Sequence, residues 1–69
     1  MDRTLSKGMT GSDVRAVQDA LNYQIRRGLT PLAIDGIFGP KTEARVTEFQ
    51  TANHLVVDGI VGPQTKSLL

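Results

Sequence analysis

Apolar residues recur at helical spacing in the first third of the chain. From Ser12 to Arg27 no glycine or proline interrupts the sequence, and one stripe of this segment is apolar apart from a single glutamine. Its members are Val14, Val17, Gln18, Leu21 and Ile25. The pattern predicts an amphipathic helix with Ser12 as its N-cap, Asp13 in its first turn and Gly28 just beyond its end.

Two further helices are predicted where a proline follows a glycine, because proline is favoured at the first helical position. Pro40 begins a segment that we expect to be helical to Ala52, and Pro63 begins a shorter helix that extends through Leu68. The shared face of the middle helix carries Thr42, Val46, Phe49 and Asn53. A short apolar segment precedes each of these helices, at residues 29–34 and 55–57, and is predicted to be a buried loop or an extended strand.

The segment before the second helix is repeated before the third. Residues 35–42, Asp-Gly-Ile-Phe-Gly-Pro-Lys-Thr, recur 23 residues later as Asp-Gly-Ile-Val-Gly-Pro-Gln-Thr, and 7 of 15 positions are identical between residues 32–46 and 55–69. The repeated structural positions are Asp35, Gly36, Phe38, Gly39 and Thr42, then Asp58, Gly59, Val61, Gly62 and Thr65. Nothing reactive is repeated, so the repeat specifies architecture before it specifies chemistry.

Each Asp-Gly pair predicts a tight turn, because aspartate can bond the backbone two residues on and glycine tolerates positive φ. Asp-Gly between apolar runs commonly forms a hairpin. Here Gly-Pro follows at once, which favours a loop that leads directly into a helix. We expect Ile37 and Phe38, with Ile60 and Val61 in the second copy, to fill the core, where burial of each such side chain is worth roughly 1.5–3 kcal/mol.

These elements predict an all-α fold, a closed three-helix bundle with two repeated Asp-Gly loop and helix-start units. We expect residues 1–69 to form one monomeric domain, with residues 1–4 as a loose N-terminal tail. A chain of this length buries only about 60% of its unfolded surface, and the absence of cysteine excludes disulfides. Helix packing must therefore supply most of the stability.

The formal net charge of +1 argues against strong electrostatic binding to nucleic acid or to an anionic membrane. No apolar run has the length of a membrane span, and residues 1–12 lack the apolar core of a signal peptide. We therefore expect no nucleic-acid partner and no membrane insertion. A helix-turn-helix protein would need these basic side chains on one face: Arg15, Arg26, Arg27, Lys41 and Arg45.

No catalytic or metal site assembles from the residue types and spacings. His54 is the only histidine and cysteine is absent, so nothing in the spacing supplies three convergent zinc ligands. Asp35 and Asp58 are followed by glycine and apolar residues, not by the alternating oxygen ligands of a calcium loop. Without a nucleophile pattern beside it, His54 is interpreted as a helix C-terminal residue. We expect no metal, no cofactor and no catalysis.

Four residues are candidate ligand contacts: Tyr23, Arg26, Arg27 and Gln50. Tyr23 lies opposite the apolar stripe of the first helix, where its ring can stack on a sugar or pack within the bundle. Arg26 and Arg27 can meet carboxylates through forked hydrogen bonds or remain solvated. The amides of Gln18 and Gln50 either bond turn backbone or contact an N-acetyl group or a peptide.

The order and spacing of these residues resemble the peptidoglycan-binding domain of bacterial and phage cell-wall hydrolases. The matching residues lie within residues 5–69 and are Gly8, Gly11, Asp13, Val14, Val17, Gln18, Leu21, Val46, Phe49 and Gln50, with both copies of the repeat. The resemblance implies a closed three-helix bundle that tethers a separate catalytic domain to murein. Residues 22–34 depart from the family's pattern, because they are longer than its usual Gly-Tyr-type turn after the first helix.

The function implied by this resemblance is non-catalytic peptidoglycan binding, as the N-terminal part of an endolysin-like enzyme acting at the cell wall or in the periplasm, with no signal peptide in this chain. Its implied partners are peptidoglycan and a covalently attached catalytic domain. Because matrix metalloproteinase prodomains contain a related bundle, the fold alone does not determine the ligand. The alternative is a protein-interaction or pro-domain-like helical bundle, which would expose an apolar patch and bind a catalytic partner but not murein sacculi.

Overall fold

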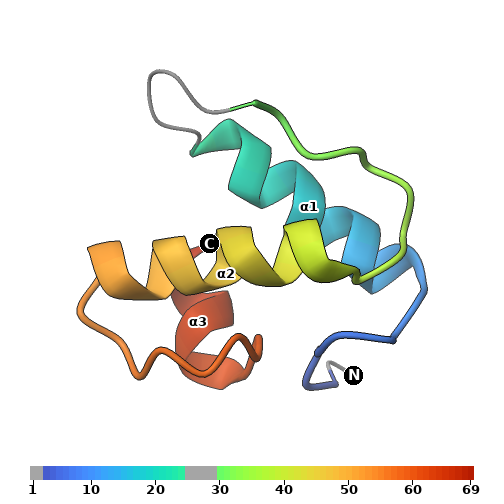
Figure 1. The fold of residues 1–69 in the computed structure, drawn as a ribbon. Coiled ribbons are helices and arrows are strands. Elements are labelled where there is room, and N and C mark those ends of the chain that lie inside the picture. The colour runs from blue at the N-terminus through green and yellow to red at the C-terminus, as the bar shows by residue number, and fades with distance from the viewer. Residues whose placement is uncertain (1–2, 25–29) are drawn as a thin grey trace.

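The secondary structure of the described residues consists of three helices, which irregular segments connect. The computed structural model describes residues 3–24 and 30–69. Within these residues the helices are α1 (Ser12–Tyr23), α2 (Pro40–Ala52) and α3 (Pro63–Leu68), and no segment is a β-strand (Figure 1). The predicted all-α fold with three helices is therefore confirmed.

The first helix buries the predicted stripe but has different ends. Its buried residues are Val14, Val17, Gln18 and Leu21. The N-cap is Gly11 rather than Ser12, because the Gly11 carbonyl accepts the first helical hydrogen bond from Arg15 N–H at 3.2 Å. The helix ends at Tyr23, with Gln24 as its C-cap. The prediction that the helix continues to Arg27 is therefore wrong, because Gln24 is no longer helical. Ile25 and Gly28 lie outside the described residues.

The early end of α1 coincides with a tertiary contact that the helical pattern does not contain. The Asn22 side chain bonds both backbone groups of Leu32, with its Oδ1 2.7 Å from Leu32 N and its Nδ2 2.9 Å from Leu32 O. Asparagine and tyrosine are weaker helix formers than leucine or alanine. A stretch free of glycine and proline permits a longer helix, whereas this contact places the Leu32 backbone beside the C-terminal end of α1.

Both later helices begin at the predicted prolines. Gly39 and Gly62 are their N-caps, each with extended backbone, and neither cap uses a side-chain hydrogen bond. The buried residues of α2 are Thr42, Val46, Phe49 and Gln50. Asn53, expected on this face, is the exposed C-cap, and its Nδ2 donates to the Phe49 carbonyl at 2.9 Å. Near its C-terminal end the buried face of α2 therefore contains Gln50 in place of Asn53.

The buried apolar core is formed by the N-terminal segment, α1, α2 and the segments that precede α2 and α3. Its buried members are Leu5, Val14, Val17, Leu21, Leu32, Phe38, Val46, Phe49 and Val61. Phe38 and Val61 are fully buried, as predicted, but Ile37 and Ile60 remain 54% and 38% exposed. Neighbouring side chains in extended chain point to opposite sides, so burial of Phe38 turns Ile37 outward. The same geometry separates Val61 from Ile60.

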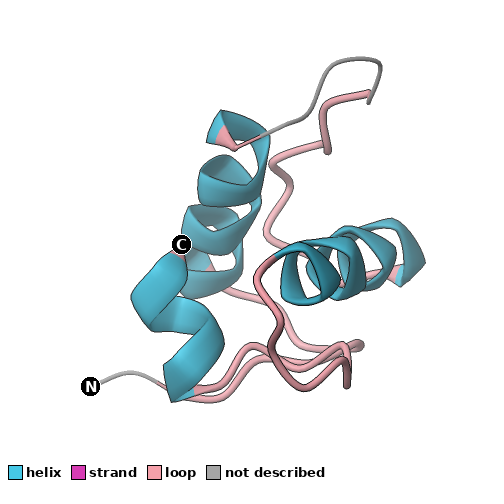
Figure 2. Cartoon of the chain, turned by 90° about the vertical axis from the view of Figure 1, so that its left-hand side faces the viewer, coloured by secondary structure: helices cyan, strands magenta, loops and turns pink. Residues whose placement is uncertain are grey.

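The N-terminal segment lies between the two repeated turns and pairs with both. Leu5 exchanges two backbone hydrogen bonds with Val61, at 3.1 and 2.8 Å, while Gly8 N–H donates to the Phe38 carbonyl at 2.8 Å and Phe38 N–H donates to the Met9 carbonyl at 2.9 Å. Three loop segments consequently lie side by side at the base of the molecule (Figure 2). This segment is a structural element that joins the two copies of the repeat.

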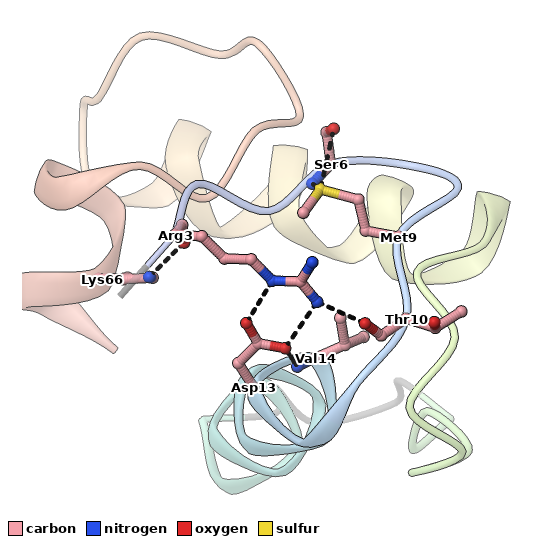
Figure 3. Close-up of polar contacts among 7 residues, drawn as sticks. All are labelled: Arg3, Ser6, Met9, Thr10, Asp13, Val14 and Lys66. Atoms are coloured by element: carbon pink, nitrogen blue, oxygen red, sulfur yellow. Dashed lines mark hydrogen bonds and ion pairs between the residues drawn. The ribbon is translucent and has the colours of Figure 1, made fainter. Parts of the chain in front are cut away.

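Arg3 does not belong to the expected loose tail. Its guanidinium pairs with the Asp13 carboxylate (Nε···Oδ2 2.7 Å and Nη2···Oδ1 3.1 Å) and also donates to the Thr10 carbonyl (Figure 3). Its own carbonyl accepts a hydrogen bond from the Lys66 ammonium on α3. These contacts connect the start of the chain to two helices. Residues 1 and 2 lie outside the described residues.

None of the helices in the described part of the chain has the length and apolar character needed to cross a bilayer. The radius of gyration of 10.7 Å is close to the value of about 11 Å expected for a folded chain of this length. The fold is therefore as compact as a single folded domain of this size.

Candidate functional site

The side-chain amide of Gln18 holds the first Asp-Gly turn against α1. Gln18 is only 1% exposed. Its Nε2 lies 3.0 Å from Asp35 Oδ1, 3.0 Å from the Ile37 carbonyl and 3.1 Å from Thr42 Oγ1. Its Oε1 accepts from the Gly36 N–H at 3.0 Å. One buried amide thus joins α1, the turn and the first turn of α2.

The amide of Gln50 repeats this arrangement between α2, the second turn and α3. Its Nε2 lies 2.9 Å from Asp58 Oδ1, 2.9 Å from the Ile60 carbonyl and 3.2 Å from Thr65 Oγ1. Its Oε1 accepts from the backbone N–H groups of Asp58 and Gly59, at 3.2 and 3.0 Å. Each helix start is therefore fastened to the preceding helix by the same chemistry.

The two turns also share their internal geometry. In each, the aspartate Oδ1 accepts a hydrogen bond from the backbone N–H two residues on, at 2.9 Å. Gly36 and Gly59 have φ of 76° and 72°, in the left-handed region that glycine adopts without a steric penalty. The backbone N–H and the glutamine amide both stabilise the carboxylate form, so the pKa values of Asp35 and Asp58 lie below their ordinary value.

The side-chain amides of Gln18 and Gln50 are buried against the two Asp-Gly turns and are not exposed at the surface. Gln50, a predicted ligand contact, is 1% exposed, and both ends of its amide are occupied by the second turn. A buried amide requires such partners. Of the two interpretations of Gln18 and Gln50, the contact with turn backbone is the one that the geometry shows, and no ligand contact is available to Gln50 in this conformation.

Tyr23 is the most exposed large hydrophobic residue in the described part of the chain. Its side chain is 92% exposed at the C-terminal end of α1, on the side opposite the buried stripe. The next residue, Gln24, reaches the Leu68 carbonyl at the end of α3 (3.4 Å). The helical wheel therefore predicts the exposure of this ring correctly. Arg26 and Arg27 lie outside the described residues.

The connection between α1 and α2 is fixed at two points. Asn22 bonds the Leu32 backbone from α1, and Arg45 Nη2 donates to the Thr30 carbonyl from α2 at 2.7 Å. Arg45 Nε also lies 3.5 Å from a Glu48 carboxylate oxygen one turn on. Residues 30–34 are thus held between the two helices, and Leu32 is buried in the core.

A groove of about 400 Å³ lies between the N-terminal segment and α3. It is lined by Arg3, Thr4, Gly62, Pro63, Lys66 and Ser67. Two of these residues are cationic and none is acidic, and Figure 3 shows the Lys66 ammonium at the Arg3 backbone carbonyl, with the Arg3 side chain extending to Asp13 and Thr10. The volume falls within the range of small-ligand sites.

Within residues 3–24 and 30–69 no group of three or more histidine, cysteine or acidic side chains is placed to hold a metal ion. The polar side chains buried in the described core are Gln18, Thr42, Gln50 and Thr65, and all four belong to the two turn clusters. The described surface therefore offers hydrogen bonds, charge and apolar contact to a ligand.

Comparison with known protein families identifies the domain. The sequence pattern of the peptidoglycan binding domain family matches residues 10–69, which include all three described helices and both Asp-Gly turns. The chain belongs to this family. The segment before Thr10 lies outside the match, although it pairs with both turns of this peptidoglycan-binding domain.

Relatives and solved structures agree with this assignment. The peptidoglycan-binding domain is 44% identical over 48 residues to an autolytic lysozyme of Clostridium acetobutylicum, and this match covers 68% of the chain but 14% of that protein. It is similar to the crystal structure of a fused Zn-dependent amidase/peptidase/peptidoglycan-binding domain-containing protein from the same species (TM-score 0.86, 35% identity, 99% of the chain, 29% of that protein). The SleB N-terminal domain is also similar (TM-score 0.87, 32% identity, 99% of the chain, 89% of that domain).

Sequence reasoning missed the tertiary contacts of two polar residues in the peptidoglycan-binding domain. The Arg3–Asp13 ion pair and the Asn22–Leu32 contact each join groups ten residues apart. Helical periodicity carries no information on either pair, because one partner lies outside the helix. An asparagine just before the end of a helix was the available signal for the second contact, since its side chain readily bonds backbone groups.

Proposed function

We propose that this domain binds murein without catalysing its cleavage and holds an attached cell-wall hydrolase at its substrate. Membership of the peptidoglycan-binding domain family is the observation that carries the proposal. The domain acts at the cell wall or in the periplasm as a monomeric module of an endolysin-like enzyme. Its partners are peptidoglycan and the catalytic domain in the same chain.

The proportions of the relatives support the tethering role. The chain spans 14% of the autolytic lysozyme and 29% of the fused amidase, whereas it spans 89% of the SleB N-terminal domain. Units of this size therefore occur beside further chain in proteins named for cell-wall enzymes. A weak binding module raises the effective concentration of an attached enzyme at its substrate without contributing to the chemical step.

Cosedimentation with purified murein sacculi tests the binding function. The folded domain is expected in the pellet at micromolar concentrations, and free soluble muropeptides should compete it into the supernatant. A folded helical domain of equal size and charge provides the control for non-specific retention. If the domain stays in the supernatant as the control does, the proposal is rejected in favour of the protein-interaction alternative.

Deletion of the domain from its parent hydrolase tests the tether. We expect the shortened enzyme to lose activity on insoluble sacculi and to keep its activity on soluble muropeptides, because tethering affects encounter with the wall only. Equal losses on both substrates would instead indicate that the domain supports the catalytic fold.

A further inference from the structure

The groove between the N-terminal segment and α3 has features that the fold does not require. We propose that it binds the carboxylate groups of murein stem peptides, an inference that rests on the proposed function and gives it a location. The lining residues are contributed by the two ends of the described chain, Arg3 and Thr4 from one and residues 62–67 from the other. Contacts within the groove hold these segments together before any ligand arrives.

The charge of the groove favours an anion. Arg3 and Lys66 line it, and none of its lining residues carries a carboxylate. Asp13 compensates the charge of Arg3, while Lys66 has no carboxylate within 4.0 Å among the described residues. The excess positive charge is therefore carried by Lys66. A carboxylate of a peptide ligand complements it.

Both cationic groups are already positioned. The Arg3 guanidinium is fixed by two contacts with Asp13 and one with the Thr10 carbonyl, and these contacts use Nε and Nη2. The Lys66 ammonium donates to the Arg3 carbonyl, and it retains further protons for a ligand. Pre-positioned side chains lose little conformational entropy when a ligand binds.

Gly62 lines the groove and leaves open space where a side chain would lie. A Cβ atom built on Gly62 would meet no other atom within 4 Å, and the backbone at this position is ordinary extended chain with φ of −95°. A larger residue is therefore accommodated without backbone strain and would occupy the groove. Gly39, its counterpart in the first copy of the repeat, has the same open surroundings and a φ of −104°.

The first copy of the repeat carries the opposite charge at the position that corresponds to Lys66. Glu43 occupies the position that corresponds to Lys66, 23 residues earlier. The two copies share their turn chemistry but reverse charge at this position. The reversal lies outside the glutamine clusters that hold each turn, so the requirements of the turn do not account for it.

Amide chemical shifts measured during titration with a synthetic murein stem tetrapeptide test this proposal. We expect the free carboxylate form to shift the amides of Gly62, Lys66 and Ser67, and the same peptide with every carboxylate amidated to leave them in place. Lys66→Gln should raise the Kd about two- to fivefold, the range of a single exposed ion pair, and added salt should weaken binding. Inorganic phosphate is the comparison ligand, and shifts as large as those from the peptide would indicate a general anion site and overturn the proposal.

Two glycine variants provide the matched comparison. Gly62→Leu fills the groove and should abolish the shifts, whereas Gly39→Leu makes the same substitution at the N-cap of α2 and should bind as the wild type does. Circular dichroism of both variants establishes that each is folded, and Lys66→Gln remains informative if Gly62→Leu does not fold. Equal binding by Gly62→Leu and Gly39→Leu, or by the free and amidated peptides, contradicts the assignment.

The result for the groove is separable from the result for the whole domain. If sacculi retain the wild type and Gly62→Leu equally, with no shifts at the groove, murein binding stands and the groove is rejected. If sacculi retain neither protein but the free peptide shifts the groove amides, carboxylate binding stands and the tethering function is rejected.

Discussion

Gln50 lies 32 residues after Gln18, repeats its four hydrogen bonds and adds a fifth, from the Asp58 N–H. Each glutamine contacts a turn aspartate, but Gln18 precedes its aspartate by 17 residues and Gln50 by only 8. Three of these nine additional residues lie in α1, which extends five residues beyond Gln18 whereas α2 extends two beyond Gln50, and the other six lie in the connection between α1 and α2. The two units therefore share one arrangement, and the first has additional residues between its glutamine and its aspartate. The Asn22–Leu32 contact joins the two sides of this longer segment.

Removal of either glutamine amide should destabilise the whole domain. Gln18→Leu and Gln50→Leu each leave a buried turn N–H and carbonyl without their partner, and we expect the free energy of unfolding to fall by about 2–4 kcal/mol. Chemical denaturation followed by circular dichroism measures this loss. Gln64→Leu, at an exposed position of α3, is the control and should change stability by no more than about 0.5 kcal/mol. Similar values for buried and exposed sites would show that the clusters do not stabilise the fold.

Acid should destabilise the domain through its turn aspartates. The pKa values of Asp35 and Asp58 are lowered by backbone N–H groups and glutamine amides, and that of Asp13 by Arg3. Because each folded-state pKa lies below the unfolded value of about 3.9, the contribution of these carboxylates is complete above that pH. It is lost as the pH falls through the folded-state values.

The midpoint of urea denaturation, measured from pH 6 down to pH 2, tests this dependence. The variant with both Asp35→Asn and Asp58→Asn should show a shallower decline below pH 4 than the wild type, because asparagine keeps the turn acceptor but does not titrate. Parallel curves for the two proteins would assign the acid sensitivity to other groups.

Local chemistry explains which parts of the fold were predictable. The Asp-Gly turns and the helices that begin at Pro40 and Pro63 follow from residues adjacent in sequence. The amide of Gln18 sits beside an apolar stripe, so its need for a buried partner was also visible. Such features require no knowledge of distant segments.

Contacts between distant segments explain the remainder. The end of α1 coincides with the Asn22–Leu32 contact. The position of Arg3 is fixed by Asp13 and by Lys66, which lies at the other end of the chain. Hydrophobic periodicity cannot encode these pairs, because only the folded chain brings their partners together. The charged groove depends on the same long-range pairing, so its lining residues could not be grouped together from the sequence.

His54 offers a test of the end of α2. Its φ of 57° places it in the left-handed region, its N–H donates to the Thr51 carbonyl at 3.2 Å, and the Leu55 N–H donates to the Gln50 carbonyl at 2.9 Å. This is the Schellman arrangement, in which glycine is the usual residue at the left-handed position. His54→Gly should therefore raise the free energy of unfolding by about 0.5–1 kcal/mol.

Thermal unfolding of His54→Gly and His54→Ala separates backbone strain from loss of the imidazole. Alanine tolerates positive φ no better than histidine, so only the glycine variant should be more stable. A gain shared by both variants would mean that the imidazole itself is unfavourable there.

The exposed ring of Tyr23 should contribute to binding rather than to folding. Tyr23→Ala removes a side chain that is 92% exposed, so we expect the free energy of unfolding to change by no more than about 0.5 kcal/mol. Its apparent affinity for sacculi should fall about two- to tenfold, because an aromatic ring can stack on the apolar face of a sugar. Tyr23→Phe keeps the ring and should bind as the wild type does. Val56→Ala, which removes another highly exposed apolar side chain from the second turn region, should leave binding unchanged, and an equal loss for Val56→Ala and Tyr23→Ala would contradict a specific role for the ring.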